Sequence, residues 1–176
     1  MQSNFLIGPP YSYSRSSPIG NYLYNLNTPL RTSGSIAFIF GNRGLISADY
    51  EYEDYTAARF SSNNFSFNDV NKAISNSYTA THNIRVGTEW RFNIFSVRGG
   101  FNYSTSPYNY KINDGEKIGF SGGVGFRQGP FFMDLAYVYS RIWEDYYLYN
   151  TAYLSSAPAK SKYTSNSLLL TLGTRF

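Results

Sequence analysis

Charged residues recur at alternate positions in segments whose other residues are mainly apolar. In residues 79–92, for example, Arg85, Glu89 and Arg91 share one parity, and aliphatic and aromatic residues occupy most of the other. Along a water-filled path, such side chains would set charge selectivity or contact the head group of an amphipathic ligand. The alternative is a structural network of paired charges inside a barrel. The pattern selects these candidate lumen-lining residues: Arg31, Asp49, Glu51, Arg85, Glu89, Arg91, Arg98, Arg127 and Asp134.

Catalytic and metal-binding chemistry has little support in the sequence. The chain has no cysteine and one histidine, His82, so a metal site built from His and Cys ligands is not expected. His82 falls on the apolar parity, and we interpret it as a membrane-interface residue. A lipase would need a nucleophilic serine beside it, but Ser75, Ser77 and Ser96 lie in a loop or on the opposite parity. We therefore predict neither an enzyme nor a cofactor.

The elements that carry the charged residues are predicted to be strands, because side chains alternate across a strand with a period of two. In a soluble sandwich, interior-facing charges would each cost several kcal/mol unless they were paired. A hydrated lumen removes that cost. The pattern therefore predicts an all-β fold, an antiparallel up-and-down transmembrane β-barrel with one face in lipid and the other in water.

The composition indicates a membrane interface. Aromatic residues make up 19% of the chain, whereas the hydrophobic fraction is only 42% and the mean hydropathy is −0.36. Amphipathic rings favour the boundary between lipid and water, so membrane lipid is an expected partner. Residues 137–149, rich in tyrosine, resemble an aromatic girdle, with a carbohydrate-binding surface as the alternative. The basic residues are scattered, so nucleic acid is not an expected partner.

Short and long connections are predicted to alternate between the strands, as in an up-and-down barrel with tight periplasmic turns and long external loops. The tight turns are expected at residues 41–44, at Asn93 and at residues 128–130. The long connections are expected at residues 61–77, 106–116 and 147–165, the first with a short helical turn over residues 67–74.

The N-terminal region is the least regular part of the sequence. We predict an irregular segment over residues 1–21 and a barrel domain over residues 22–176, with Pro29 as a bulge or kink between two strand-like stretches. The barrel domain holds about seven or eight strands. Residues 1–10 lack the features of a secretory signal, and bacterial single-chain barrels have an even strand number, so we expect an N-terminal portion to be missing.

Several segments resemble known outer-membrane proteins. The last ten residues alternate and end on Phe176, which resembles the sorting signal that the barrel-assembly machinery recognises. Five further segments, in their order along the chain, resemble the C-terminal half of the FadL/TodX family of outer-membrane transporters for hydrophobic compounds. These segments are Asn27–Arg31, Phe38–Tyr52, Asn83–Arg91, Val97–Phe101 and Asp134–Tyr137, and the resemblance extends from Tyr22 to Phe176.

The resemblance implies part of a fourteen-stranded barrel in the outer membrane of a Gram-negative bacterium. It also implies passive uptake of long-chain fatty acids or other hydrophobic small molecules. The family's N-terminal hatch has no counterpart before Tyr22. Two other interpretations stay open: a barrel without transport activity, such as an adhesin or a structural anchor, and a soluble lipocalin-like carrier. The carrier would place its apolar residues inside and its charges outside.

Overall fold

The computed structural model describes residues 2–6, 12–16, 23–109, 113–147, 150–151, 154–155 and 157–175. The described elements are β1 (Gln2–Leu6), β2 (Ser12–Ser16), β3 (Asn25–Asn27), β4 (Leu30–Phe40), β5 (Gly44–Asp54), the 3-10 helix η1 (Tyr55–Ala57), β6 (Arg59–Ser61), α1 (Asn68–Ser77), β7 (Ala80–Phe92), β8 (Phe95–Ser104), β9 (Lys117–Gln128), β10 (Phe131–Tyr146), β11 (Asn150–Thr151), β12 (Leu154–Ser155) and β13 (Ala159–Thr174).

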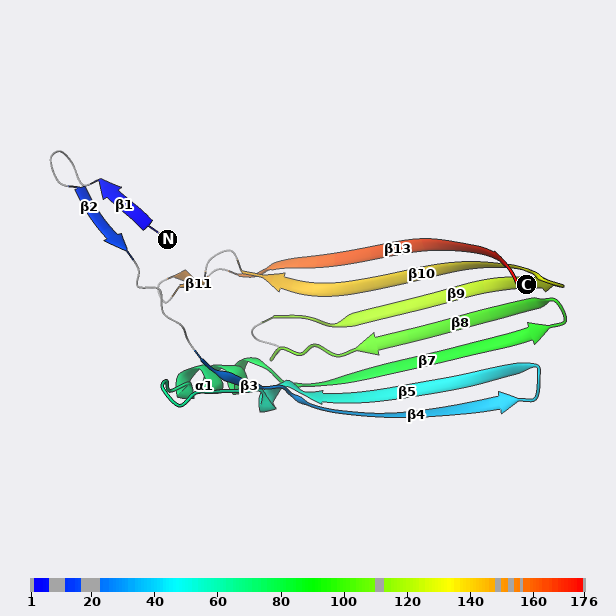
Figure 1. Cartoon of the computed structure of the whole chain (residues 1–176), viewed down its shortest axis with the longest axis horizontal. Coiled ribbons are helices and arrows are strands. Elements are labelled where there is room, and N and C mark those ends of the chain that lie inside the picture. Colours follow the sequence, from blue (N-terminus) through cyan, green and yellow to red (C-terminus); the bar gives the residue numbers. More distant parts are fainter. Residues whose placement is uncertain are drawn as a thin grey trace.

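A seven-stranded antiparallel sheet dominates the fold, in the order β13-β10-β9-β8-β7-β5-β4 (Figure 1). Each strand pairs with the sheet strands before and after it along the chain, so the topology is a simple meander. This confirms the predicted all-β, antiparallel fold. The sheet is open in the described part of the chain, because β4 and β13 form its two edges and do not pair with each other.

The three tight turns lie together at one end of the sheet, which we call the turn end (Figure 1). They follow β4, β7 and β9, and Gly41, Asn93 and Gly129 adopt positive φ angles there. Glycine and asparagine tolerate this conformation better than other residues. The long connections and α1 lie at the opposite end, the loop end. β13 begins at Ala159, earlier than expected. The first residues of this strand are mostly polar on both faces, so an apolar alternation does not reveal them.

The helix in the first long connection contacts the strand that precedes it. α1 covers Asn68–Ser77, so the helical turn expected over residues 67–74 is present and is longer. The amide of Asn71 binds the backbone of β6 twice: the N–H of Phe60 donates to Oδ1 over 2.8 Å, and Nδ2 donates to the Phe60 carbonyl over 2.9 Å. Rings from Tyr24, Phe60 and Phe67 pack beside this contact.

Pro29 lies where the first edge strand is interrupted. β3 ends at Asn27 and β4 begins at Leu30, and β3 pairs with β6 outside the large sheet. The neighbouring strand is interrupted at the same level, where η1 separates β5 from β6. Proline lacks the N–H that a continuous ladder needs, so a break at this position is expected.

The first 21 residues contain more regular structure than we expected. β1 and β2 form an antiparallel hairpin in which Phe5 pairs with Tyr13, so the prediction of an irregular segment was wrong for residues 2–6 and 12–16. Each of these strands has only five residues. Such short strands are hard to recognise from alternation alone.

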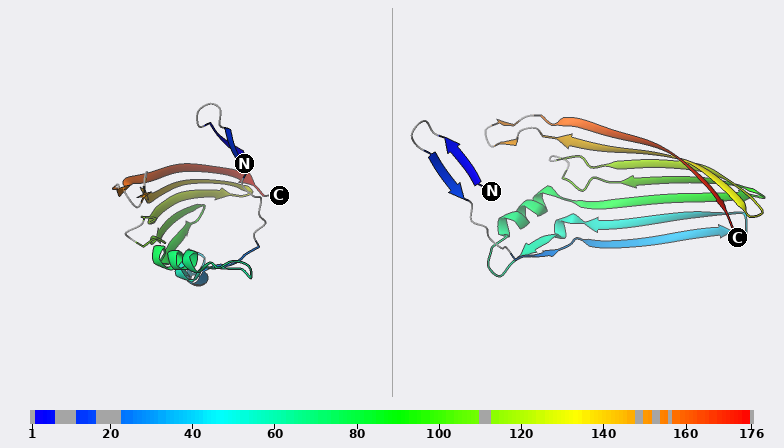
Figure 2. Two further views of the ribbon diagram at one scale, coloured as in Figure 1. Left: turned by 90° about the vertical axis from the view of Figure 1, so that its left-hand side faces the viewer. Right: turned by 45° about the horizontal axis from the view of Figure 1, so that its top comes forward.

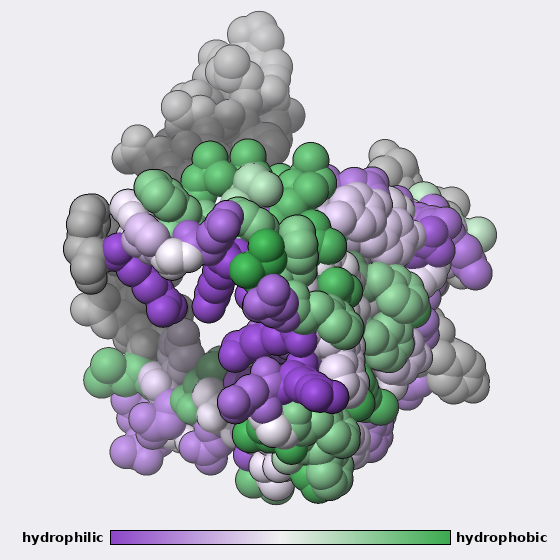
Figure 3. All heavy atoms as spheres, turned by 90° about the vertical axis from the view of Figure 1, so that its right-hand side faces the viewer, coloured by the Kyte–Doolittle hydropathy of each residue, from purple (hydrophilic) through white to green (hydrophobic). Residues whose placement is uncertain are grey.

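The large sheet is curved into a trough with a convex outside and a concave inside (Figure 2). Hydrophilic side chains gather on the hollow inner side and hydrophobic ones on the outside (Figure 3). In the described residues no hydrophobic side chain is buried, so this sheet has no apolar core of its own. The arrangement of the two faces is opposite to the one that a soluble lipocalin-like carrier requires.

Candidate functional site

The convex face has two aromatic bands with a mostly aliphatic zone between them. Because the ladder registers run without interruption, alternate residues of each strand belong to this face. The loop-end band contains Tyr50, Tyr52, His82, Tyr103, Tyr139 and Trp143, and the turn-end band contains Phe40, Trp90, Phe92, Phe95, Phe126 and Phe131. Exposed aliphatic residues between the bands include Ile36, Ile84, Val86, Val97, Val124, Leu135, Leu168 and Leu170.

His82 belongs to the loop-end band, on the apolar face where its parity placed it. Its Nδ1 lies 2.7 Å from the hydroxyl of Tyr50, and the ring lies between Tyr50 and Tyr52, with centroid distances of 6.0 and 5.5 Å. Both hydrogen-bonding groups are exposed. This contact uses the polar tips of amphipathic rings, as is typical of residues where an apolar surface meets water.

The concave face carries all nine charged residues that the alternation selected. Seven of them form two ionic groups. The first, the Glu51 cluster, consists of Arg31, Glu51, Asn83 and Arg85 on β4, β5 and β7. Arg31 donates to Oε2 of Glu51, and Asn83 Nδ2 donates to Oε1 over 2.9 Å. Arg85 Nη2 lies 3.7 Å from the same oxygen.

Glu51 is only 6% exposed, although it is charged and lies on the strand next to the β4 edge of the sheet. A carboxylate in such a place is stabilised by multiple donors, which Arg31 and Asn83 supply here. The two arginines outnumber the single carboxylate of the cluster. The Glu51 cluster therefore has an excess of one positive charge.

The second group, the Glu89 network, consists of Arg91, Glu89, Arg98 and Asp134. Arg91 and Arg98 each donate through Nε to a different oxygen of Glu89, over 2.7 and 2.8 Å. Arg98 also donates through Nη1 to Asp134 Oδ1 over 2.6 Å. Two cations and two anions balance within this network.

The bond between Arg98 and Asp134 joins β8 to β10 across the intervening strand. Gly123 and Gly125 of β9 lie between these residues in the register. A Cβ atom at Gly125 would lie 2.5 Å from Asp134 Oδ1, so a larger residue would collide with the carboxylate. The glycines of β9 therefore have a positional role, because they leave room for an ion pair that spans three strands.

The two remaining candidates, Asp49 and Arg127, take part in no ion pair between described residues. Asp49 is the register partner of Arg85. The guanidinium of Arg127 lies 5.9 Å from the centroid of the Phe132 ring, which covers Gly173. Phe176, the expected sorting signal, lies outside the described residues.

A cavity of about 430 Å³ lies at the loop end of the concave face. Its wall includes Glu51 and Arg85 from the Glu51 cluster and residues that the sequence pattern did not select. These are mainly loop residues or residues at strand ends, including Glu53, Tyr55, Tyr108, Asp114, Lys117, Trp143 and Glu144. Alternation along β9 could have identified Lys117 as a residue of the charged face. Tyr108 and Asp114 lie in a long connection whose sequence has no periodicity, so no pattern predicts their positions.

The chemistry of the cavity is polar and mixed in charge. Burial raises the pKa of the Tyr55 hydroxyl, and so does its 3.0 Å hydrogen bond to Glu53 Oε2. Four carboxylates line the cavity, from Glu51, Glu53, Asp114 and Glu144, and they face the cations Arg85 and Lys117. Such a cavity suits water, ions or the polar end of a larger molecule.

In the described residues, no group of three or more His, Cys, Asp or Glu side chains has the arrangement of a metal site. The described helices include none that is both long enough and apolar enough to cross a membrane. No family model, curated protein or solved structure matches this chain.

Proposed function

We propose that this chain forms part of the wall of an outer-membrane β-barrel. The barrel would admit small hydrophobic molecules passively, as the resemblance to the FadL/TodX family predicts. The observation that carries the proposal is the division of the sheet into an apolar convex face and a charged concave face. A lipid exterior and a hydrated lumen would satisfy both faces at once.

The exposed aliphatic residues support the lipid side of this proposal. Leu168, Leu170 and Leu172 on β13 are 73%, 61% and 68% exposed. Burying one leucine side chain fully contributes about 1.5–3 kcal/mol relative to leaving it in water. A continuous surface of such residues between two aromatic bands suits the hydrocarbon zone and the interfaces of a bilayer. The strands of the sheet have 10 to 16 residues, enough for the roughly 9–11 residues that cross a bilayer.

The concave side of β10 and β13 supports a hydrophobic or amphipathic cargo. The inner positions of these strands include the apolar residues Phe132, Ala136, Val138, Ile142 and Leu169. Polar residues lie among them, including Asp134 of the Glu89 network and Glu144. The concave face thus offers apolar positions close to charged ones. A molecule with a polar end and an apolar chain would find complementary surfaces on this face.

Adjacent leucines on β13 provide the test. Leu170 lies on the convex face and Leu169 on the concave face, and both are at least half exposed. In lipid vesicles, Leu170→Arg should lower the free energy of unfolding by about 2–4 kcal/mol, because it places a charge in hydrocarbon. Leu169→Arg should have little effect, because it adds a charge to a hydrated lumen.

Heat-modifiable gel migration and protection from added protease measure insertion of the two variants. Each variant is the control for the other, since both make the same chemical change one residue apart. Equal losses for both variants, or a larger loss for Leu169→Arg, would contradict the proposed orientation in a membrane.

A further inference from the structure

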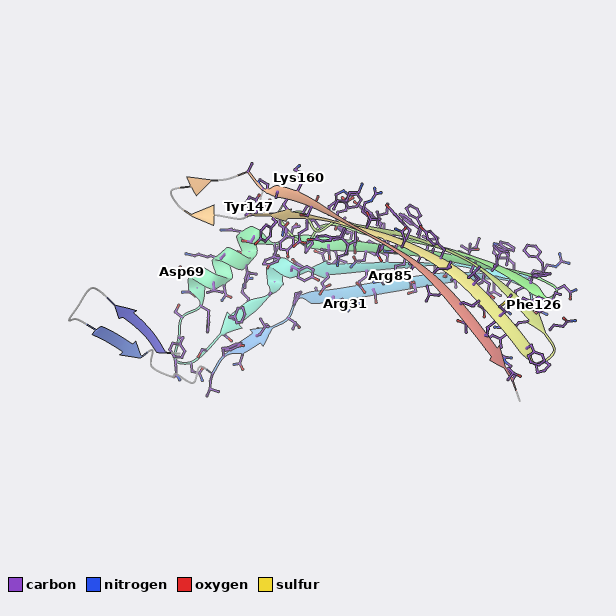
Figure 4. The ribbon with its side chains drawn as sticks, turned by 90° about the horizontal axis from the view of Figure 1, so that it is seen from above. Arg31, Asp69, Arg85, Phe126, Tyr147 and Lys160 are labelled. Atoms are coloured by element: carbon purple, nitrogen blue, oxygen red, sulfur yellow. The ribbon has the colours of Figure 1, made fainter. Side chains whose placement is uncertain are left out.

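One corner of the convex face combines basic and aromatic residues at the loop ends of β10 and β13. We call it the basic corner, and it consists of Tyr139, Arg141, Trp143, Lys160 and Lys162. In the register of the two strands, Lys162 pairs with Trp143, and Arg141 pairs with Thr164. The side chains of the corner therefore lie on one face, with Arg141 one same-face rung from Trp143 and Lys162 and two rungs from Lys160. Figure 4 shows Lys160 at this end of the sheet.

Arg141 is held in place by two rings. Its guanidinium carbon lies 5.4 Å from the centroid of Tyr139 and 5.5 Å from that of Trp143. Its Nε is buried and has no hydrogen-bond partner in the described part of the structure. The rings restrict the guanidinium without neutralising it, and a planar guanidinium suits the oxygens of a phosphate group.

The charge of the corner is not balanced. The convex-face residues of the large sheet in the described ranges are uncharged except near the loop end, where Asp54, Arg141, Asp145, Lys160 and Lys162 lie. Asp145 pairs in register with Lys160, whereas Asp54 lies on distant β5. The salt bridges between described residues include none from Arg141, Lys160 or Lys162. Glu116 adds a second carboxylate at this end, since its carbonyl accepts from the N–H of Trp143 over 3.1 Å. Three cations thus lie near two carboxylates, which leaves an excess of one positive charge.

The convex face becomes apolar a short way from the corner, toward the turn end. On β13, Thr164 and Asn166 come first, followed by Leu168 and Leu170, and Leu168 is 73% exposed. The positive corner therefore lies at the loop-end border of the surface that the proposed function places in hydrocarbon. In a bilayer this is the level of lipid head groups.

We propose that the basic corner binds the phosphorylated head group of a membrane lipid, with the phosphate on Arg141 and Lys162 and an acyl chain along Leu168 and Leu170. The inference rests on the proposed function, because it takes the convex face to be the lipid face. It adds a specific site on that face. Charge complementarity selects an anionic lipid over a zwitterionic one.

The test measures thermal unfolding of the whole chain in dodecyl maltoside micelles during titration with dihexanoyl phosphatidic acid. We expect a saturable rise in the unfolding midpoint. Dihexanoyl phosphatidylcholine and inorganic phosphate should each give a much smaller rise. In Arg141→Gln/Lys162→Gln, apparent affinity should fall about tenfold for each charge-assisted contact removed.

Two further variants keep the test decisive. Lys72→Gln removes a cation at the same end of the molecule, on α1 and outside both the basic corner and the cavity wall, and it should titrate like the unmodified chain. Lys162→Glu reverses one charge but leaves Arg141 between its rings, so it should abolish the rise even if the double variant folds poorly.

Three results would overturn the inference: equal stabilisation by both lipids, equal stabilisation by inorganic phosphate, or an unchanged response in Lys162→Glu. The Leu169 and Leu170 variants report membrane insertion independently. If the protein inserts as proposed but is stabilised equally by the two lipids, this result would contradict the lipid site and leave the proposed function standing.

Discussion

The two ionic groups of the concave face use the same residue types but differ in balance. The Glu89 network has two cations and two anions, and its short bonds reach from β7 to β10. The Glu51 cluster has two arginines for one carboxylate, and Arg85 lies 3.7 Å from its partner. Of the two groups, only the Glu51 cluster borders the loop-end cavity. The comparison indicates that the network holds strands in register, while the cluster places Glu51 and Arg85 on the wall of a cavity that a bound molecule could enter.

The strongest way to break the network is to fill the space beneath it. Gly125→Val should lower the free energy of unfolding by about 1–3 kcal/mol, because the added side chain collides with Asp134 and Ser96. Denaturant titration in micelles measures the loss. Gly34 is the matched control, since a Cβ atom there meets nothing within 4 Å. A similar loss for Gly34→Val would show that strand glycines matter in general and that the network does not.

Removing one charge from the network should have a smaller effect. Asp134→Asn leaves Arg98 with Glu89 as its remaining partner, so we expect a loss of about 1–2 kcal/mol after allowing for partial exposure. A double-mutant cycle with Arg98→Gln isolates the pair, because the two residues contact each other directly. A coupling energy near zero would contradict a structural role for this bond.

Glu51→Gln should change stability least and permeation most. It removes the only carboxylate of the Glu51 cluster, so Arg31 and the cavity-lining Arg85 lose the carboxylate that they share. For the proposed barrel in a planar bilayer under a KCl gradient, we expect the reversal potential to shift toward anion selectivity. Asp49→Asn is the control, because Asp49 lies on the same strand and face and forms no ion pair with a described residue. Equal shifts for the two variants would argue against a special role for the cluster.

The sequence was sufficient to predict the faces but not the partners of the charged residues. Alternation assigned Glu51, Arg98 and Asp134 to one face because the period of a strand is two, whatever the register. It could not predict that Arg98 reaches Asp134, since this contact depends on the order and register of three strands. The sequence could not predict the cavity for a related reason. Residues such as Tyr108 and Asp114 lie in a connection whose sequence has no hydrophobic periodicity.

One departure from the predicted strands has a simple physical cause. The polar beginning of β13 has no apolar face to reveal its alternation, so the pattern predicts a loop for its first residues. Alternation also separates two faces without saying which one is concave. The structure places the charges inside the curve (Figure 3).

The two edge strands of the sheet run in the same direction, since β4 and β13 both begin at the loop end. A strand that pairs with both neighbours in antiparallel fashion must run against each of them. Completing this sheet into a ring of antiparallel pairs therefore requires an odd number of additional strands. Two copies of the seven-stranded sheet around a common axis would instead meet along two parallel seams. The direction of two edge strands thus restricts which polypeptides can close the ring, independently of their sequences.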